Sequence, residues 1–239
     1  MKGLLTALLM LPVLAFSAEE DDWPMAEFAP DVENLPSLQK GFRLYVNYCL
    51  GCHGLKYQRY ERTADDLGIP HDIALESLVL SDQKIGELMT SSMPTEQAKK
   101  WFGADPPDLT LIARARDAEW IYNYLKTFYV DESRPFGVNN KVFENVGMPN
   151  VLAGLQGVQR EACAPGTEKC YELSVDEGSG TYSREQFDMA IYDLTNFLYY
   201  VGDPSRFERQ RIGVYVLLFL IVLGCFTFLL NREYWKDIH

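Results

Sequence analysis

The sequence predicts an all-α fold, in which a helical domain with long loops is followed by one C-terminal transmembrane helix. Apolar residues recur at helical spacing in three separate stretches, and stretches rich in Gly and Pro lie between them. Near the C-terminus, residues 212–230 form an uncharged run of the length that spans a bilayer. A chain of 239 residues has room for one core of ordinary size plus extra segments, but not for two large domains.

The N-terminal end has the pattern of a cleaved secretory signal. A basic residue precedes an apolar run that closes on small residues, which favours a signal over a spanning helix. We place the signal at residues 1–17, because cleavage after Ser17 leaves small residues at both recognition positions. Cleavage after Ala18 is the alternative. Residues 18–35 are acidic and contain proline, so we expect an extended arm there.

The main domain is expected over residues 36–205 and begins with a helix. From Ser37 onward, one face of this helix carries the apolar residues Leu38, Phe42, Tyr45 and Val46. The helix would carry the chain to Cys49. A second helix is expected from Asp117 over DAEWIYNYLKTFY, whereas residues 133–150 have the composition of loops.

The last helix of this domain has a clear start and a clear stop. Ser183 and Gln186 have the spacing of a capping box, and Gly202 and Pro204 end the helical pattern. Between these signals, one face carries the apolar residues Phe187, Ile191, Leu194 and Leu198. We expect the first and last helices to cross and form the core.

Residues 212–230 are expected to anchor the chain in a membrane. A helix of this length rises about 28 Å, against a hydrocarbon core of about 30 Å. A buried core helix is the alternative, but basic residues bracket the run at interface depth; they are Arg206, Arg209, Arg211, Arg232 and Lys236. After a cleaved signal this helix stops transfer, so residues 206–211 form an external juxtamembrane segment and residues 231–239 a cytoplasmic tail. The basic residues do not set this orientation independently, because both flanks contain them.

The exported part of the chain is strongly acidic. Residues 19–211 contain 32 acidic and 19 basic residues, a net charge of −13. Such a domain repels phosphate backbones, so nucleic acid is not expected as a partner, whereas a basic protein would be attracted most strongly at low salt. A merely soluble acidic surface is the alternative interpretation.

Cys49-Leu50-Gly51-Cys52-His53 is the attachment pattern of a c-type haem. Two intervening residues match the separation of the two haem vinyl groups, to which the thiols add, and the adjacent imidazole then reaches the iron. A thioredoxin-like redox pair would require a βαβ context that the sequence lacks. A zinc site would require a second Cys or His pair, and the other histidines are His71 and the terminal His239. The sequence therefore predicts one covalent haem c.

The iron of such a haem needs a sixth ligand or an open position. A thioether would raise the reduction potential by favouring ferrous iron, and the exported candidates are Met25, Met89, Met93, Met148 and Met189. Met93 lies 40 residues after His53 and Met148 lies 95 residues after it, and proline follows both. The residues alone do not choose between these two, and either could be an ordinary core methionine.

The remaining cysteines have simpler interpretations. Cys163 and Cys170 flank a short loop with a Pro-Gly turn, and a disulfide is expected in an oxidising compartment. Two free thiols are the alternative. Cys225 lies within the spanning run and is expected to act as a small apolar residue.

Four sequence stretches resemble the cytochrome c1 family, the haem-bearing subunits of ubiquinol–cytochrome c oxidoreductase. They are YCLGCHGLKYQRY at 48–60, PPDLTLIARAR at 106–116, RPFGVNNKVFENVGMPNVLAGLQG at 134–157, and the anchor helix with its preceding LTNFLYYVGDPSRFERQRIGVYVLL. The resemblance implies a class I cytochrome c-like haem domain and a set of site residues. Cys49 and Cys52 would hold the haem, His53 and Met148 would bind the iron, Arg116 would pair with a propionate, and Pro107 would line the ring. A surface charge beside Asp117 is the alternative for Arg116.

By the same resemblance, the chain would be an electron-transport subunit of the respiratory chain without bond-making chemistry of its own. It would accept an electron from the Rieske iron–sulfur subunit and pass it to a soluble, basic c-type cytochrome. Cytochrome b would be its other partner, in a dimeric cytochrome bc1 complex of a bacterial inner membrane, with the haem domain in the periplasm. The alternatives are a tethered cytochrome that serves a terminal oxidase, a haem-based sensor or peroxidase with an open sixth position, and an assembly subunit without redox turnover.

Overall fold

The computed structural model describes residues 23–80, 82–164, 167 and 170–236, and helices form its core. The expected signal at residues 1–17 lies outside the described residues. Within the described residues the helices are α1 (Leu35–Tyr48), α2 (Tyr60–Asp66), α3 (His71–Ser77), α4 (Thr95–Phe102), α5 (Ile112–Ala115), α6 (Ala118–Lys126), α7 (Ala153–Gln156), α8 (Arg184–Gly202) and α9 (Arg206–Tyr234). Short antiparallel pairs of strands lie in the loops: β1 (Leu55–Arg59) with β2 (Leu88–Met89), β3 (Phe128–Val130) with β4 (Val138–Asn140), and β5 (Gln159–Glu161) with β6 (Leu173–Val175). The all-α prediction describes the core, and the strands are an addition to it.

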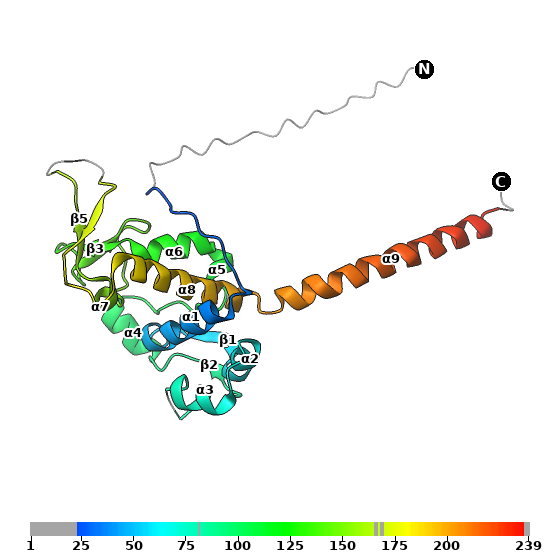
Figure 1. Ribbon diagram of the computed structural model, residues 1–239, viewed down its shortest axis with the longest axis horizontal. Helices are drawn as coiled ribbons and strands as arrows, with labels where there is room; N and C mark the ends of the chain where they lie inside the picture. Colours follow the sequence, from blue (N-terminus) through cyan, green and yellow to red (C-terminus); the bar gives the residue numbers. More distant parts are fainter. Residues whose placement is uncertain (1–22, 81, 165–166, 168–169, 237–239) are drawn as a thin grey trace, which may run out of the picture.

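α1 and α8, which lie far apart in the sequence, pack against each other at the centre of the fold (Figure 1). α8 begins with the predicted capping box, in which the side chains of Ser183 and Gln186 each accept a hydrogen bond from the other residue's amide. The predicted apolar faces of both helices are buried. Between them, the rings of Phe42 and Phe197 stack with centroids 5.2 Å apart. The expected crossing of the first and last helices is therefore confirmed.

Gly41 allows the two helices to approach this closely. A Cβ atom at Gly41 would lie 2.1 Å from the carbonyl oxygen of Asp193 and 2.6 Å from the Cβ of Phe197. No side chain fits at such distances without moving a helix. Helical periodicity gives no sign of this contact, because it depends on where α8 lies.

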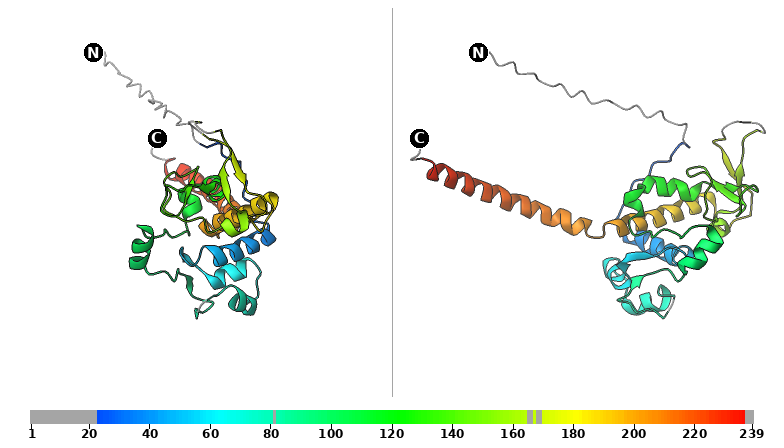
Figure 2. Two further views of the ribbon diagram at one scale, coloured as in Figure 1. Left: turned by 90° about the vertical axis from the view of Figure 1, so that its left-hand side faces the viewer. Right: turned by 180° about the vertical axis from the view of Figure 1, so that it is seen from behind.

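α6 packs on α5 and α8, and α1 separates this upper part of the domain from a lobe formed by β1, β2, α2 and α3 (Figures 1 and 2). Asp117 begins α6 with a φ of 71°, and its side chain accepts a hydrogen bond of 2.6 Å from the Ala118 amide. The predicted helix from Asp117 is confirmed as far as Lys126, but its last predicted residues, Phe128 and Tyr129, belong to β3 instead. α2, α3 and α4 were not predicted, because they are short; α3 and α4 are also mostly exposed, each with one buried residue, and so give little apolar periodicity.

The described part of the N-terminal arm lies across α6 and α8 without helix or strand structure. Two buried asparagines hold its backbone. The side chain of Asn123 accepts from the Ala26 amide and donates to the Ala26 carbonyl, both at 2.8 Å. Asn196 makes the same pair of bonds to Asp31, at 3.0 and 2.7 Å. Paired side-chain bonds thus take the place of strand pairing along this arm.

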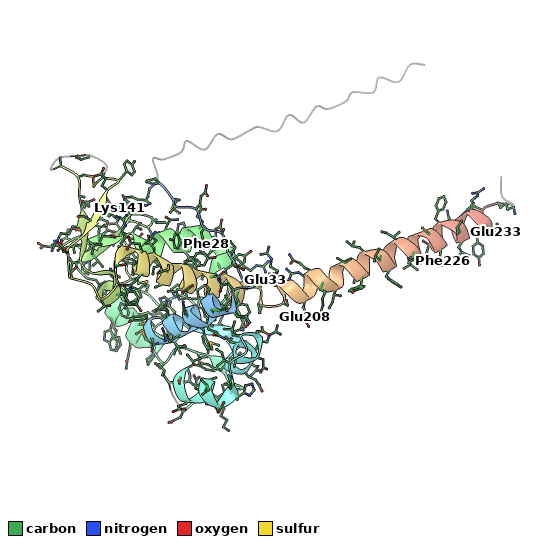
Figure 3. The ribbon with its side chains drawn as sticks, in the orientation of Figure 1. Phe28, Glu33, Lys141, Glu208, Phe226 and Glu233 are labelled. Carbon is green, nitrogen blue, oxygen red and sulfur yellow. A yellow bond between two sulfur atoms is a disulfide. The ribbon has the colours of Figure 1, made fainter. Side chains whose placement is uncertain are left out.

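α9 projects away from the domain (Figure 3). Its apolar side chains are exposed, Phe226 by 67%, and residues Glu208–Tyr234 are long and apolar enough to cross a membrane. An exposed apolar surface of this size requires a lipid or protein environment. The helix begins at Arg206, several residues before the predicted run at residue 212, so the expected juxtamembrane segment is part of the same helix.

Candidate haem site

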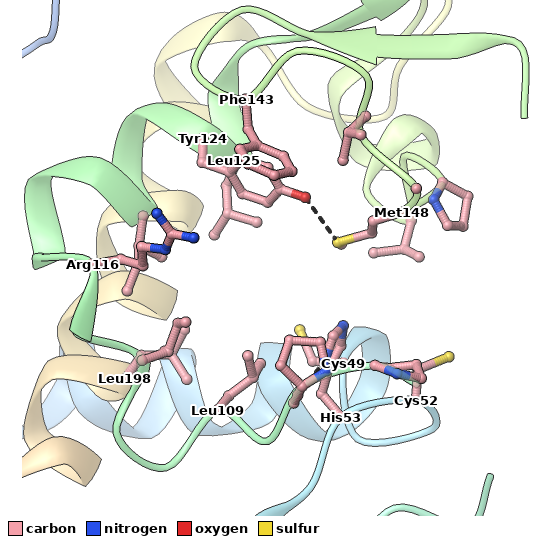
Figure 4. A pocket seen from close by; sticks show the side chains of 18 of the residues that line it. Cys49, Cys52, His53, Leu109, Arg116, Tyr124, Leu125, Phe143, Met148 and Leu198 are labelled. Carbon is pink, nitrogen blue, oxygen red and sulfur yellow. Dashed lines mark hydrogen bonds between the residues drawn. The ribbon is translucent and has the colours of Figure 1, made fainter. Parts of the chain in front are cut away.

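A cavity of about 390 Å³ lies between the end of α1, the loop before α5, α6, α8 and the loop that follows β4. This volume is within the usual range of cofactor pockets, about 300–1,000 Å³. Side chains of Cys49, Cys52, His53 and Leu109 lie on one side of the cavity and those of Tyr124, Phe143 and Met148 on the other (Figure 4). We call these the proximal and distal sides. The lining is mostly apolar, which suits a flat hydrophobic ring.

The proximal side is formed by a tight turn at the end of α1. The amides of Cys52 and His53 both donate to the carbonyl of Cys49, at 3.0 and 2.8 Å, and the Tyr45 hydroxyl donates to the carbonyl of His53 at 2.7 Å. These bonds bring both thiols and the imidazole to the same cavity. Because these bonds are local, five consecutive residues and the end of one helix determine the shape of this turn.

The orientation of the His53 ring is fixed from the loop before α5. Nδ1 of His53 lies 2.7 Å from the carbonyl oxygen of Pro107, and a carbonyl can only accept, so Nδ1 carries the proton. Burial lowers the pKa of His53, which keeps the ring neutral. The lone pair of Nε2 is then available to a metal, and Pro107 both lines the cavity and sets the histidine tautomer.

The two thiols have none of the electrostatic features of a redox pair. Burial raises the pKa of Cys49 to about 12 and also raises the pKa of Cys52, whereas reactive Cys-X-X-Cys pairs have a lowered pKa. Among the described residues, no group of three or more His, Cys, Asp or Glu side chains could hold a metal ion. The thioredoxin and zinc interpretations therefore have no support in the described structure.

Met148 lines the distal side of the cavity, and the other candidate methionines do not. Met25 and Met189 are 37% and 60% exposed, and Met89 is fully buried in β2. Met93 is half-buried in the turn before α4, where its amide donates to Ser91. Of the five candidates, Met148 is therefore the methionine that the geometry favours, because it lies across the cavity from His53 (Figure 4).

A hydrogen bond joins Met148 to α6. The hydroxyl of Tyr124 donates to Sδ of Met148 at 3.4 Å (Figure 4). The Tyr124 ring stacks on Trp120, with centroids 4.9 Å apart and planes inclined by 10°. Burial raises the pKa of Tyr124, so the hydroxyl keeps its proton. Sequence reasoning missed this residue, because tyrosine in an amphipathic helix gives no specific signal.

Two neighbouring asparagines hold the loop that delivers Met148. The buried Asn140 carboxamide accepts from the amides of Val142 and Phe143, at 2.9 and 3.1 Å, and donates to the carbonyl of Tyr124 at 2.7 Å. Asn139 accepts from the Asn145 amide at 2.9 Å. Adjacent asparagines are typical of such side-chain turns, and here they form the end of β4; this signal was present in the sequence.

Arg116 lies at the edge of the cavity, at the end of α5. Its guanidinium lies over the Trp120 ring at 5.4 Å. The neighbouring Asp117 carboxylate is used to cap α6, and no ion pair of Arg116 is found among the described residues. A guanidinium placed in this way can form two aligned hydrogen bonds with a carboxylate of a bound group.

The remaining predicted cysteine pair lies apart from the cavity. Cys163 and Cys170 form a disulfide that closes the turn between β5 and β6. These residues do not line the cavity. The disulfide therefore shapes a surface hairpin and contributes nothing directly to the site.

Comparison with known proteins places the chain in a family. The model of the Cytochrome C1 family matches residues 26–238. The chain is 44% identical over 244 residues to a cytochrome c1 from Allochromatium vinosum, covering 100% of this chain and 99% of the relative. It is 42% identical to a protein named ammonia monooxygenase gamma subunit from Nitrosomonas europaea, covering 100% and 98%. A cytochrome c1 from Rhodobacter capsulatus is 24% identical over 83% of this chain and 82% of its own.

Proposed function

The chain belongs to the cytochrome c1 family, and from this premise we propose that its cavity holds the haem through Cys49 and Cys52, with His53 and Met148 as axial ligands. Members of the family carry one covalently bound haem c. They are membrane-anchored and form the electron-transfer subunit of the cytochrome bc1 complex, with cytochrome b and the Rieske protein. The chain is accordingly an electron-transfer subunit of such a complex.

One observation carries the residue assignment: a single apolar cavity has His53 on one side and Met148 on the other. The bound haem supplies a one-electron redox couple, and the chain's own residues bind, orient and shield it. Pro107 holds the His53 ring, and the Asn140 turn holds the loop that carries Met148. Arg116 is placed to neutralise a propionate, which would otherwise be a costly charge beside apolar walls. These contacts support a class I cytochrome c arrangement.

We also propose that the domain faces the periplasm in a bacterial inner membrane. The export signal expected from the sequence and the exposed apolar helix α9 support this orientation. Protease added outside intact spheroplasts is expected to digest the haem domain. Protection of the domain until the membrane is opened would contradict the orientation.

The proposed electron acceptor is a soluble, basic c-type cytochrome, reached from one haem in each half of a dimeric complex. The net charge of −13 over residues 19–211 supports a cationic partner, because opposite charge speeds the encounter of two proteins. The second-order rate of electron transfer to such a partner should fall as salt rises. A rate that does not depend on salt would remove the electrostatic argument for this partner.

The name of the Nitrosomonas relative belongs to that protein and brings no further activity to this chain. The described residues include no cluster of metal-ligating side chains for a monooxygenase centre. Paired catalytic carboxylates or a nucleophile with its base were likewise not found in the sequence. Electron transfer through the haem is the function that the described site supports.

The experiment that tests the assignment compares Met148→Leu with Met93→Leu in the purified complex. Met148→Leu should lower the reduction potential sharply and abolish the absorption that arises from the thioether-to-ferric-iron bond, because leucine cannot bind iron. Met93→Leu should leave both properties unchanged. If Met93→Leu abolishes the absorption instead, Met148 is not the sixth ligand.

A further inference from the structure

We propose that Tyr124 is a positioning residue for the distal ligand: its hydroxyl donates a hydrogen bond to Sδ of Met148 and thereby raises the reduction potential of the site. The inference rests on the proposed function, in which Met148 binds the iron. It goes beyond that function because it assigns to α6 a role in setting the potential.

The contact itself is the first observation. The Tyr124 oxygen lies 3.4 Å from Sδ of Met148, within the range of a hydrogen bond to sulfur. A thioether sulfur has two lone pairs, so it can bind a metal through one and accept a hydrogen bond through the other. Met148 also has no other hydrogen-bond donor to its sulfur among the bonds found in the described residues.

The second observation is that the donor is held from three directions. Its ring stacks on Trp120 and meets the edge of the Phe128 ring, with centroids 5.1 Å apart and planes at 71°. Its backbone carbonyl accepts from the Asn140 side chain at 2.7 Å. Because Asn140 also holds the loop that carries Met148, the donor and the acceptor share one support. Groups held in this way keep their geometry when their neighbours change charge.

The chemistry gives the direction of the effect. A hydrogen bond withdraws electron density from the sulfur, so the thioether stabilises ferric iron less well. Hydrogen bonds to ligand atoms tune metal sites in this way. The reduced state is therefore favoured while the bond is present, and its removal lowers the potential.

α6 offers a matched control. Tyr122 is two residues away on the same helix and on another face, where its ring contacts Phe28 and its hydroxyl accepts from Lys126. It does not line the cavity. Tyr124→Phe and Tyr122→Phe each remove one hydroxyl from α6, and only the first removes a bond to the ligand.

The test is a redox titration of the purified complex that contains each variant. Tyr124→Phe should retain covalent haem and the thioether-to-ferric-iron absorption, and should lower the equilibrium constant for reduction about threefold, or about 28 mV at 59 mV per tenfold for one electron. Tyr122→Phe should match the wild type. A Tyr124→Phe potential equal to the wild type would overturn the inference.

Two further measurements keep the outcome interpretable. Trp120→Leu removes the stacking partner but keeps the hydroxyl, and should lower the potential in the same direction by less. If Tyr124→Phe does not accumulate, an unchanged potential in Trp120→Leu overturns the inference. Met148→Leu separates the two claims: if it keeps the thioether absorption, the ligand assignment fails, and if it loses the absorption while Tyr124→Phe behaves as wild type, only the role of Tyr124 fails.

Discussion

On the proximal side of the cavity, both thiols and the imidazole come from five consecutive residues, whereas the distal side is assembled from α6 and the loop after β4. On the proximal side, hydrogen bonds between close neighbours form the turn, and two long-range contacts hold it, from the Pro107 carbonyl to His53 and from the Ser91 hydroxyl to the carbonyl of Gly51. On the distal side, Met148 depends on Asn140 and Tyr124, which belong to other elements. A local motif can keep its geometry when distant parts of the chain move, but an assembled one cannot. Substitutions on the two sides should therefore have different effects: loss of covalent haem attachment on the proximal side, and opening of the Met148 loop on the distal side.

The largest expected effect tests the proximal side. Replacing both Cys49 and Cys52 by Ser should abolish covalent attachment, because the thioether bonds have no other thiol donor in this turn. Mass spectrometry of the denatured protein should show the unmodified chain, whereas Met148→Leu should keep the full haem mass. A haem mass that persists in the double variant would show that attachment occurs elsewhere in the chain.

The next effect tests the distal side. Asn140→Ala leaves the amides of Val142 and Phe143 and the carbonyl of Tyr124 without their partner. Each unsatisfied buried group costs about 1–3 kcal/mol, so the loop should open while the haem stays covalently bound. Carbon monoxide should then bind promptly to the reduced variant. The exposed Asn47, whose side chain bonds only to Arg43 in the described structure, provides the control Asn47→Ala. If the Asn140 variant excludes carbon monoxide as the wild type does, the loop has another support.

The smallest effect concerns the packing of α1 against α8, which supports both sides of the cavity. Gly41→Ala would place a Cβ 2.1 Å from the Asp193 carbonyl, and overpacking of this kind costs about 1–3 kcal/mol. For a domain of this size, we expect the melting temperature to fall by about 2–4 °C for each kcal/mol. Gly154→Ala, with no atom within 4 Å of the added Cβ, is the control and should not be destabilised. An unchanged melting temperature for Gly41→Ala would mean that α1 and α8 can separate without cost.

The proximal turn and the main helices could largely be predicted from the sequence. Leu38, Phe42 and the capping box at Ser183 are local patterns, and the structure places them as expected. The short helices between residues 60 and 102 could not be predicted from the sequence, because each is at most eight residues long and presents too few buried apolar residues to establish a helical period. Among the methionines, local sequence gave Met93 and Met148 equal standing, the family resemblance implied Met148, and the structure places the loop that carries Met148 at the cavity.

By itself the sequence determined the Cys49–His53 turn, the long apolar C-terminal helix and the capped core helix, because each depends on spacings within a few turns of the chain. Only the tertiary structure shows that Met148 lies across the cavity from His53, that Gly41 must remain small, and that Tyr124 and Asn140 hold Met148 and its loop. These features depend on contacts between residues that are distant in sequence. Such contacts exist only after the helices have packed, so no local pattern of residues records them.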